Sequence, residues 1–228
     1  LSQLARRATG SASYAMTLAF RRGVPELQVT TNLQGLSLAL PPPLGKAAEA
    51  SLALRFENQV LRESLAGPAQ GSNGTNLSPL RDQVTVDLGS LGSATYVRDL
   101  GGPQPRVVRG ALGIGLSGGE SAPLPVQGVA ANIQQDRLDV DAWEEVLTQA
   151  TSSGAATTAS ATTASGIAQD YLPTTLALRA RELTLQGRTL HNIVAGAVRN
   201  GTTWHANLDA AELNGYLEYR QPGSAENP

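Results

Sequence analysis

The chain lacks cysteine and is poor in aromatic residues, in lysine and in long apolar runs. Without cysteine it has no disulfide, no thiolate metal site and no cysteine nucleophile, which leaves the redox compartment open. Aromatic residues make up 4% of the 228 positions, so leucine, valine and alanine must supply the interior. A formal net charge of −2 gives no positive field for nucleic acid or an anionic membrane surface. No stretch reaches the roughly 20 apolar residues that cross a bilayer, and none resembles a signal peptide.

Apolar and polar residues alternate with a period of two along most of the chain. In residues 14–21, Tyr14, Met16, Leu18 and Phe20 fall on one face. The same pattern returns in "ELQVTTNL", "SLALRF", "QVTVDL", "VVRGALGIGL" and "TLALRARELTL". Strands this frequent, without helices between them, predict a mostly β fold built on an antiparallel sheet.

One helix is expected, in "LDVDAWEEVLTQ" (residues 138–149). Asp141 with Glu144 resembles a capping box, and Asp139 is a competing N-cap, so the helix should begin near Asp139. Trp143, Val146 and Leu147 then share an apolar stripe. A helix that plugs one end of the sheet is the main prediction, and a partner-docking helix is the alternative.

Residues 151–166 are threonine, serine, alanine or glycine throughout, a composition that cannot bury enough surface to offset its ordering entropy. We therefore divide the chain into a β-rich segment with the helix (1–147), a low-complexity loop (148–170), C-terminal strands with a hairpin (171–222) and a tail (223–228).

Two glycine-rich motifs overlap after the strand near residue 112. "GIGLSG" fits G-x-G-x-x-G, the dinucleotide fingerprint, and "GLSGG" fits G-x-S-x-G, the nucleophile elbow, with Ser117 followed by Asp136 or Asp139 and then by a histidine. Both mechanisms need a helix directly after the motif. Pro123 and Pro125 stand where that helix would run, so we expect neither a nucleotide site nor a hydrolase.

The two histidines, His191 and His205, flank the pair Asn200-Gly201, which is the strongest short hairpin signal. A loop of these two residues predicts the pairs Arg199–Thr202, Val198–Thr203, Ala197–Trp204 and Gly196–His205. On that register one face of the hairpin is wholly apolar and His205 lies on the other face. His191 falls roughly 17 Å from Gly196 at the usual rise per residue, too far for both imidazoles to bind one zinc ion. We predict no metal site, no cofactor and no catalysis; Asp209 and Glu212 read as turn residues.

Three stretches resemble AsmA-like bacterial envelope proteins of the YhdP branch. They are "LQVTTNLQGLSLALPPPLGKAAEASLALRF", "LDVDAW" and "LPTTLALRARELTLQGRTLHNIVAGAVRNGTTWHANLDAAELNGYLEYR". The resemblance covers residues from about Tyr14 to Arg220. It implies a C-terminal fragment of a long periplasmic protein, anchored in the inner membrane elsewhere in its chain. It also implies a sheet curled into an open apolar groove that moves phospholipid towards the outer membrane and supports its barrier.

On this interpretation phospholipid acyl chains lie along one apolar face, and outer-membrane or periplasmic proteins are further partners. The alternative is a structural or docking module whose apolar faces close on themselves. Strand parity gives the candidate groove-lining residues: Ile193, Ala195, Ala197, Trp204, Ala206 and Leu208 from the hairpin, with Leu176, Leu178, Leu213, Leu217 and Tyr219 from neighbouring runs.

Overall fold

The computed structural model describes residues 7–21, 23–62, 79–116, 122–152 and 170–220. Strands make up most of these residues. In chain order the elements are β1 (Ala8–Gly10), β2 (Tyr14–Arg21), β3 (Val24–Thr31), β4 (Leu36–Leu38), β5 (Leu54–Val60), β6 (Arg81–Asp87), the short 3-10 turn η2 (Gly89–Leu91), β7 (Gly92–Asp99), β8 (Arg106–Ile114), β9 (Gly128–Asp139), α2 (Val140–Ser152), β10 (Thr175–Leu185), β11 (Arg188–Asn200), β12 (Thr203–Asp209) and β13 (Asn214–Arg220).

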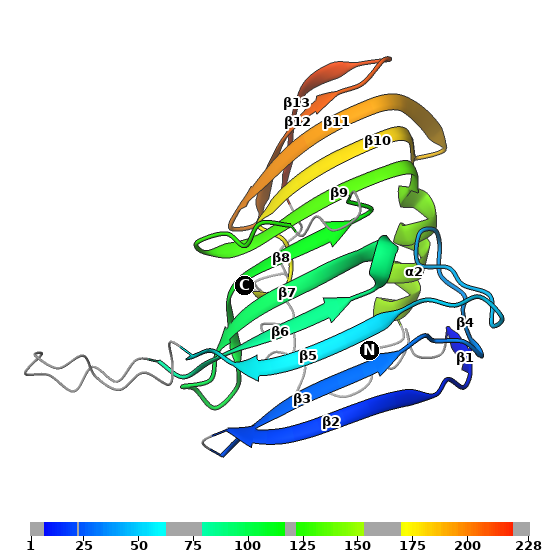
Figure 1. Ribbon diagram of the computed structural model, residues 1–228. Coiled ribbons are helices and arrows are strands. Elements are labelled where there is room, and N and C mark those ends of the chain that lie inside the picture. Colours follow the sequence, from blue (N-terminus) through cyan, green and yellow to red (C-terminus); the bar gives the residue numbers. More distant parts are fainter. Residues whose placement is uncertain (1–6, 22, 63–78, 117–121, 153–169, 221–228) are drawn as a thin grey trace, which may run out of the picture.

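Eleven strands form one sheet in the order β13-β12-β11-β10-β9-β8-β7-β6-β5-β3-β2, so neighbours in space are mostly neighbours in sequence. β2 and β13 are its two edges, and the sheet is not closed into a barrel (Figure 1). β1 and β4 pair in a separate two-stranded sheet. The predicted mostly β fold, with a large open sheet and one α-helix in the described residues, is confirmed.

Two of the ten strand pairs in the large sheet are parallel, namely β8 with β9 and β9 with β10. The other eight pairs are antiparallel, and the predicted helix, α2, lies in the connection between the parallel strands β9 and β10. A parallel pair needs a connection of a dozen or more residues to return the chain to the same end. Residues 115–127 and 140–174 supply that length, and β10 to β13 continue the sheet that β2 to β9 begin.

Helix α2 begins directly after β9, and its N-cap is Asp139. The Asp139 carboxylate accepts a hydrogen bond from the backbone N–H of Ala142 at 2.9 Å. Asp141 does not cap the helix. Its carboxylate accepts hydrogen bonds from the backbone N–H groups of Gln186 (2.6 Å) and Gly187 (2.8 Å) in the β10–β11 turn. The helix lies beside the ends of the central strands (Figure 1), where Val140 packs on the sheet, as predicted for a plug.

Strands β9, β10 and β11 change phase at one common level. The ladder partners pass from Ala180–Ile193 to Glu182–His191, and Asn192 between them has a φ of 53°. With strict alternation Leu183 would face away from Ala180, yet both are buried in one cluster with Ile193. The ladders skip one residue in each strand at this level without a change of register, and apolar side chains therefore lie on the same side before and after the break.

Candidate functional site

A row of apolar side chains crosses all eleven strands of the large sheet. Each member is the ladder partner of the next, so all of them share one face, which we call the apolar face. From β13 to β2 the row is Leu217, Ala206, Ala197, Leu176, Ala131, Leu112, Ala94, Val86, Phe56, Val29 and Met16. At about 4.8 Å between strands, ten gaps make a path of roughly 48 Å.

The opposite face, the polar face, carries a different set of residues. The row one residue along reads Tyr216, Asn207, Gly196, Ala177, Asn132, Gly113, Ser93, Asp87, Arg55, Thr30 and Ala15. This contrast between faces is the period-two pattern of the sequence realised in space.

The apolar row is not sealed. Of its eleven members only Ala131 is buried, at 4% exposure. The two ends are well exposed, with Met16 at 58% and Leu217 at 60%. A sandwich core would hide all of these side chains, whereas in this row only Ala131 is hidden.

The structure brings most of the sequence-predicted lining residues onto the apolar face. Leu176, Leu178, Ala195, Ala197, Trp204, Ala206, Leu208, Leu217 and Tyr219 lie there by ladder register. Ile193 shares the face but has 0% exposure, since it packs in the cluster with Ala180 and Leu183. Leu213 lies in the turn before β13, outside the ladder, and is 46% exposed.

The predicted hairpin loop, Asn200-Gly201, is shifted by one residue in the structure, so the predicted register is wrong. Asn200 stays in β11 and pairs with Thr203, so the loop is Gly201-Thr202, with Gly201 at a φ of 61°. Ala197 therefore pairs with Ala206 instead of Trp204, a slip of two residues. An even slip leaves every side chain on its predicted face, so His205 still lies opposite the apolar row. The face is not wholly apolar, however, because Arg199 lies on it and pairs with Trp204.

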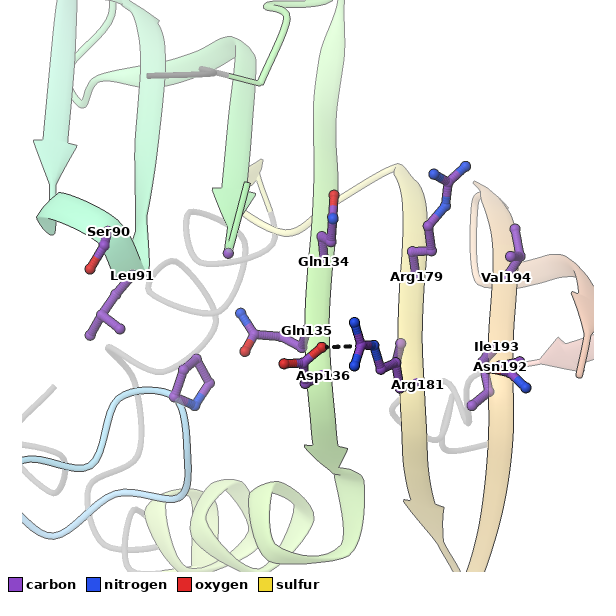
Figure 2. Close-up of a pocket in the computed structure, with 13 residues that line it drawn as sticks. Ser90, Leu91, Gln134, Gln135, Asp136, Arg179, Arg181, Asn192, Ile193 and Val194 are labelled. Atoms are coloured by element: carbon purple, nitrogen blue, oxygen red, sulfur yellow. Dashed lines mark ion pairs between the residues drawn. The ribbon is translucent and has the colours of Figure 1, made fainter. Parts of the chain in front are cut away.

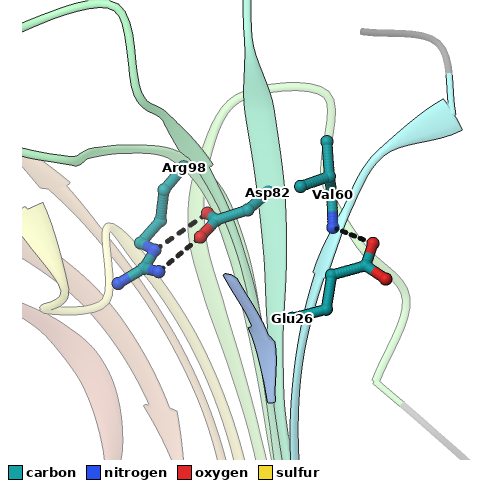
Figure 3. Close-up of polar contacts among 4 residues, drawn as sticks. All are labelled: Glu26, Val60, Asp82 and Arg98. Carbon is teal, nitrogen blue, oxygen red and sulfur yellow. Dashed lines mark hydrogen bonds and ion pairs between the residues drawn. The ribbon is translucent and has the colours of Figure 1, made fainter. Parts of the chain in front are cut away.

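Polar side chains interrupt the apolar face near the start of β6. Asp82, 2% exposed, meets Arg98 of β7 in a two-point ion pair, with Nε to Oδ1 at 3.0 Å (Figure 3). The hydrogen bonds to Asp82 raise the pKa of Arg98 above its usual range, against the opposing effect of burial. The charges of Asp82 and Arg98 therefore neutralise each other. Nearby, the Glu26 carboxylate accepts from the N–H of Val60 at 3.1 Å (Figure 3).

The chain before β10 crosses the same part of the face. The Tyr171 ring meets the Tyr96 ring edge-on, at 5.0 Å between centroids, and the Tyr96 hydroxyl donates to the Tyr171 carbonyl at 3.1 Å. Burial, with the charge of Tyr171, raises the pKa of Tyr96, so it stays a hydrogen-bond donor. Gly110 lies beneath the Tyr96 ring, where a Cβ would approach it to 2.5 Å.

A hollow of about 560 Å³ lies at the bend of β9, β10 and β11 (Figure 2). Its lining is mixed: Gln134, Gln135 and Asn192 are polar, whereas Leu91 and Ile193 are apolar. Arg181 and Asp136 form an ion pair across it at 3.2 Å, with both side chains more than 80% exposed. Such an exposed pair contributes little to stability.

The two histidines have separate partners. His191 contacts Glu212, which also accepts from the His191 N–H at 2.8 Å. His205 contacts the hydroxyl of Tyr216 on the polar face. Within the described ranges, no three histidine, aspartate or glutamate side chains are grouped to hold a metal ion. Ser117 lies outside the described residues, and residues 122–127 after the glycine motifs carry no helix.

Comparisons with known proteins agree with the resemblance seen in the sequence. No curated protein and no solved structure matches the chain. Among the described residues, no helix is long and apolar enough to cross a membrane. The protein-family model described as "YhdP protein" matches residues 1–228, the whole chain. The chain therefore belongs to the YhdP protein family, which makes it an envelope protein of the AsmA type.

Proposed function

We propose that this chain is a segment of a periplasm-spanning, inner-membrane-anchored protein that conducts phospholipid towards the outer membrane. The acyl chains would lie on the apolar face while the headgroups remain in water. The observation that carries the proposal is the continuous apolar row from Met16 to Leu217, roughly 48 Å long, in which every member except Ala131 is at least partly exposed. Outer-membrane and periplasmic proteins are the expected further partners, and barrier integrity is the expected cellular role.

The chemistry of such a path is simple. Each methylene that leaves water for an apolar surface contributes about 0.8 kcal/mol, and no specific polar contact is needed. A surface of leucine, valine and alanine offers similar affinity at each position, so a lipid has no deep minimum in which to stop. We therefore propose a non-catalytic protein without a cofactor.

The openness of the row separates this proposal from the alternative of a closed docking module. A docking module would bury the apolar side chains within its own fold, whereas ten of the eleven row members keep some exposure. Family membership supports the envelope setting.

Lipid content of the purified full chain tests the proposal. Native mass spectrometry should find phospholipid bound to the wild-type chain. Leu176→Gln places an amide on the row and should lower the bound phospholipid, whereas Ala177→Gln, the next residue on β10, faces the polar side and should not. A chain without phospholipid, or equal losses from both variants, would contradict the proposal.

A further inference from the structure

Arg199 is a cation on the apolar face with no carboxylate partner in the described part of the chain. Its guanidinium carbon lies 5.8 Å from the centroid of the Trp204 ring, its ladder partner on β12. Its backbone N–H donates to the carbonyl of Thr174 at 2.7 Å, which fixes the strand position. Arg98, another arginine on this face, is neutralised by Asp82.

The surroundings of Arg199 are amphipathic. It borders a hollow of about 570 Å³ at the start of β8, β9 and β10, whose walls include Val107, Val129 and Leu172. Asp170 lines the same hollow, but its carboxylate faces Arg106 at 4.0 Å. On the strands beyond Arg199, Trp204 pairs with Tyr219 of β13, which is 53% exposed. Aromatic rings with a polar atom are typical of sites where an apolar surface meets water.

We propose that Arg199, which lies over the Trp204 ring, binds the phosphate of a phospholipid whose acyl chains lie on the adjacent apolar row. This inference rests on the proposed function and adds a headgroup site to it. The row of Ala197, Ala206 and Leu217 lies two residues along the strands from Arg199, Trp204 and Tyr219. That is about 7 Å, a short step from a phosphate to the first acyl carbons.

A guanidinium suits this role because its planar fork donates two parallel hydrogen bonds to phosphate oxygens. The face of an aromatic ring attracts a cation electrostatically, so Trp204 can hold the guanidinium in place without a carboxylate. We expect Arg199 to bind a lipid phosphate and not free phosphate, because the ligand gains affinity when its acyl tails reach the apolar row.

Titration calorimetry with the full chain tests the site, using short-chain lipids below their micelle concentration. Dihexanoylphosphatidic acid carries the phosphate, dihexanoylglycerol lacks it, and inorganic phosphate lacks the tails. Arg199→Gln should weaken binding of the phosphatidic acid by about tenfold or more and leave the glycerol lipid unchanged. Arg179→Gln is the matched control, because Arg179 lies on the polar face, where its ladder partners are Gln134 and Val194.

Each outcome decides between the two proposals. Equal affinity of the wild type and Arg199→Gln for the phosphatidic acid would overturn the headgroup site alone, with the apolar face still binding both lipids. If inorganic phosphate binds as tightly as the phosphatidic acid, Arg199 binds free anions, and the proposal that its ligand is a lipid is wrong. Failure of the wild type to bind either lipid would refute the proposed function itself. An intermediate affinity of Arg199→Lys, which keeps the charge but not the fork, would support the geometry.

Discussion

Replacement of Ala206 by arginine tests whether the apolar face is open. Ala206 lies in the row between Leu217 of β13 and Ala197 of β11, and its side chain is partly exposed. An arginine at this position has a charged group in the proposed acyl path. On an open face its long stem can lie along the sheet while the guanidinium reaches water.

The size of the stability loss follows from this exposure. On an open face the substitution costs about 1 kcal/mol or less, within the range of strand preferences, and lowers the melting temperature by roughly 2–4 °C. A sealed core would instead bury an unpaired charge, at a cost of several kcal/mol. Ala131 supplies the internal comparison, because it lies in the same row at 4% exposure, so Ala131→Arg should destabilise the fold strongly.

The assay pairs thermal unfolding with outer-membrane permeability in cells. Ala206→Arg should remain folded and lose barrier function, while Asn207→Arg, the next residue on β12 and on the polar face, should keep both. A folded Ala206→Arg protein with a normal barrier would refute the lipid path. Unfolding as severe as that of Ala131→Arg would refute the open face and favour the closed docking module.

Three further changes have definite expectations. Asp82→Ala leaves the partly buried Arg98 charge without its partner and should cost about 2–3 kcal/mol in urea unfolding, much of which Arg98→Met in the same chain should restore. Hydrogen bonds from the His191 backbone and ring lower the pKa of the Glu212 carboxyl in the folded protein. The ionised carboxylate therefore stabilises the fold above the pKa that Glu212 has in the unfolded chain, and this stabilisation is lost as the pH falls through the folded-state pKa. Glu212→Gln should flatten this acid limb when the free energy of unfolding is measured against pH. Barrier function should survive, in stably folded variants, alanine at each of three positions proposed to be non-catalytic: Ser117, His191 and His205.

The faces of the strands could be predicted from sequence because side chains alternate with a period fixed by the backbone. The hairpin shows how robust this inference is: its register differs from the prediction, yet Trp204, Ala206 and Leu208 lie on the predicted face because the slip is even. The position of Arg199 on that face could also have been derived from its parity, but its contact with Trp204 depends on the true register.

The parallel strands were missed because alternation carries no information about direction. The lengths of the connections, residues 115–127 and 140–174, were the signal that could have found them. The Asp82–Arg98 pair could not be predicted either, since it depends on the register between β6 and β7. The break at Asn192, which has a φ of 53°, lies next to the buried cluster around Ile193, and no local sequence motif marks it.

Photo-crosslinking of lipid in living cells tests the central claim most directly. A benzoylphenylalanine at Phe56, in the apolar row, and one at Gln59, an exposed position of the same strand on the other face, differ mainly in the direction of the side chain. We expect phospholipid adducts, identified by mass spectrometry, at position 56 and few or none at position 59. Adducts at neither position, or at both equally, would contradict a lipid path along the apolar face.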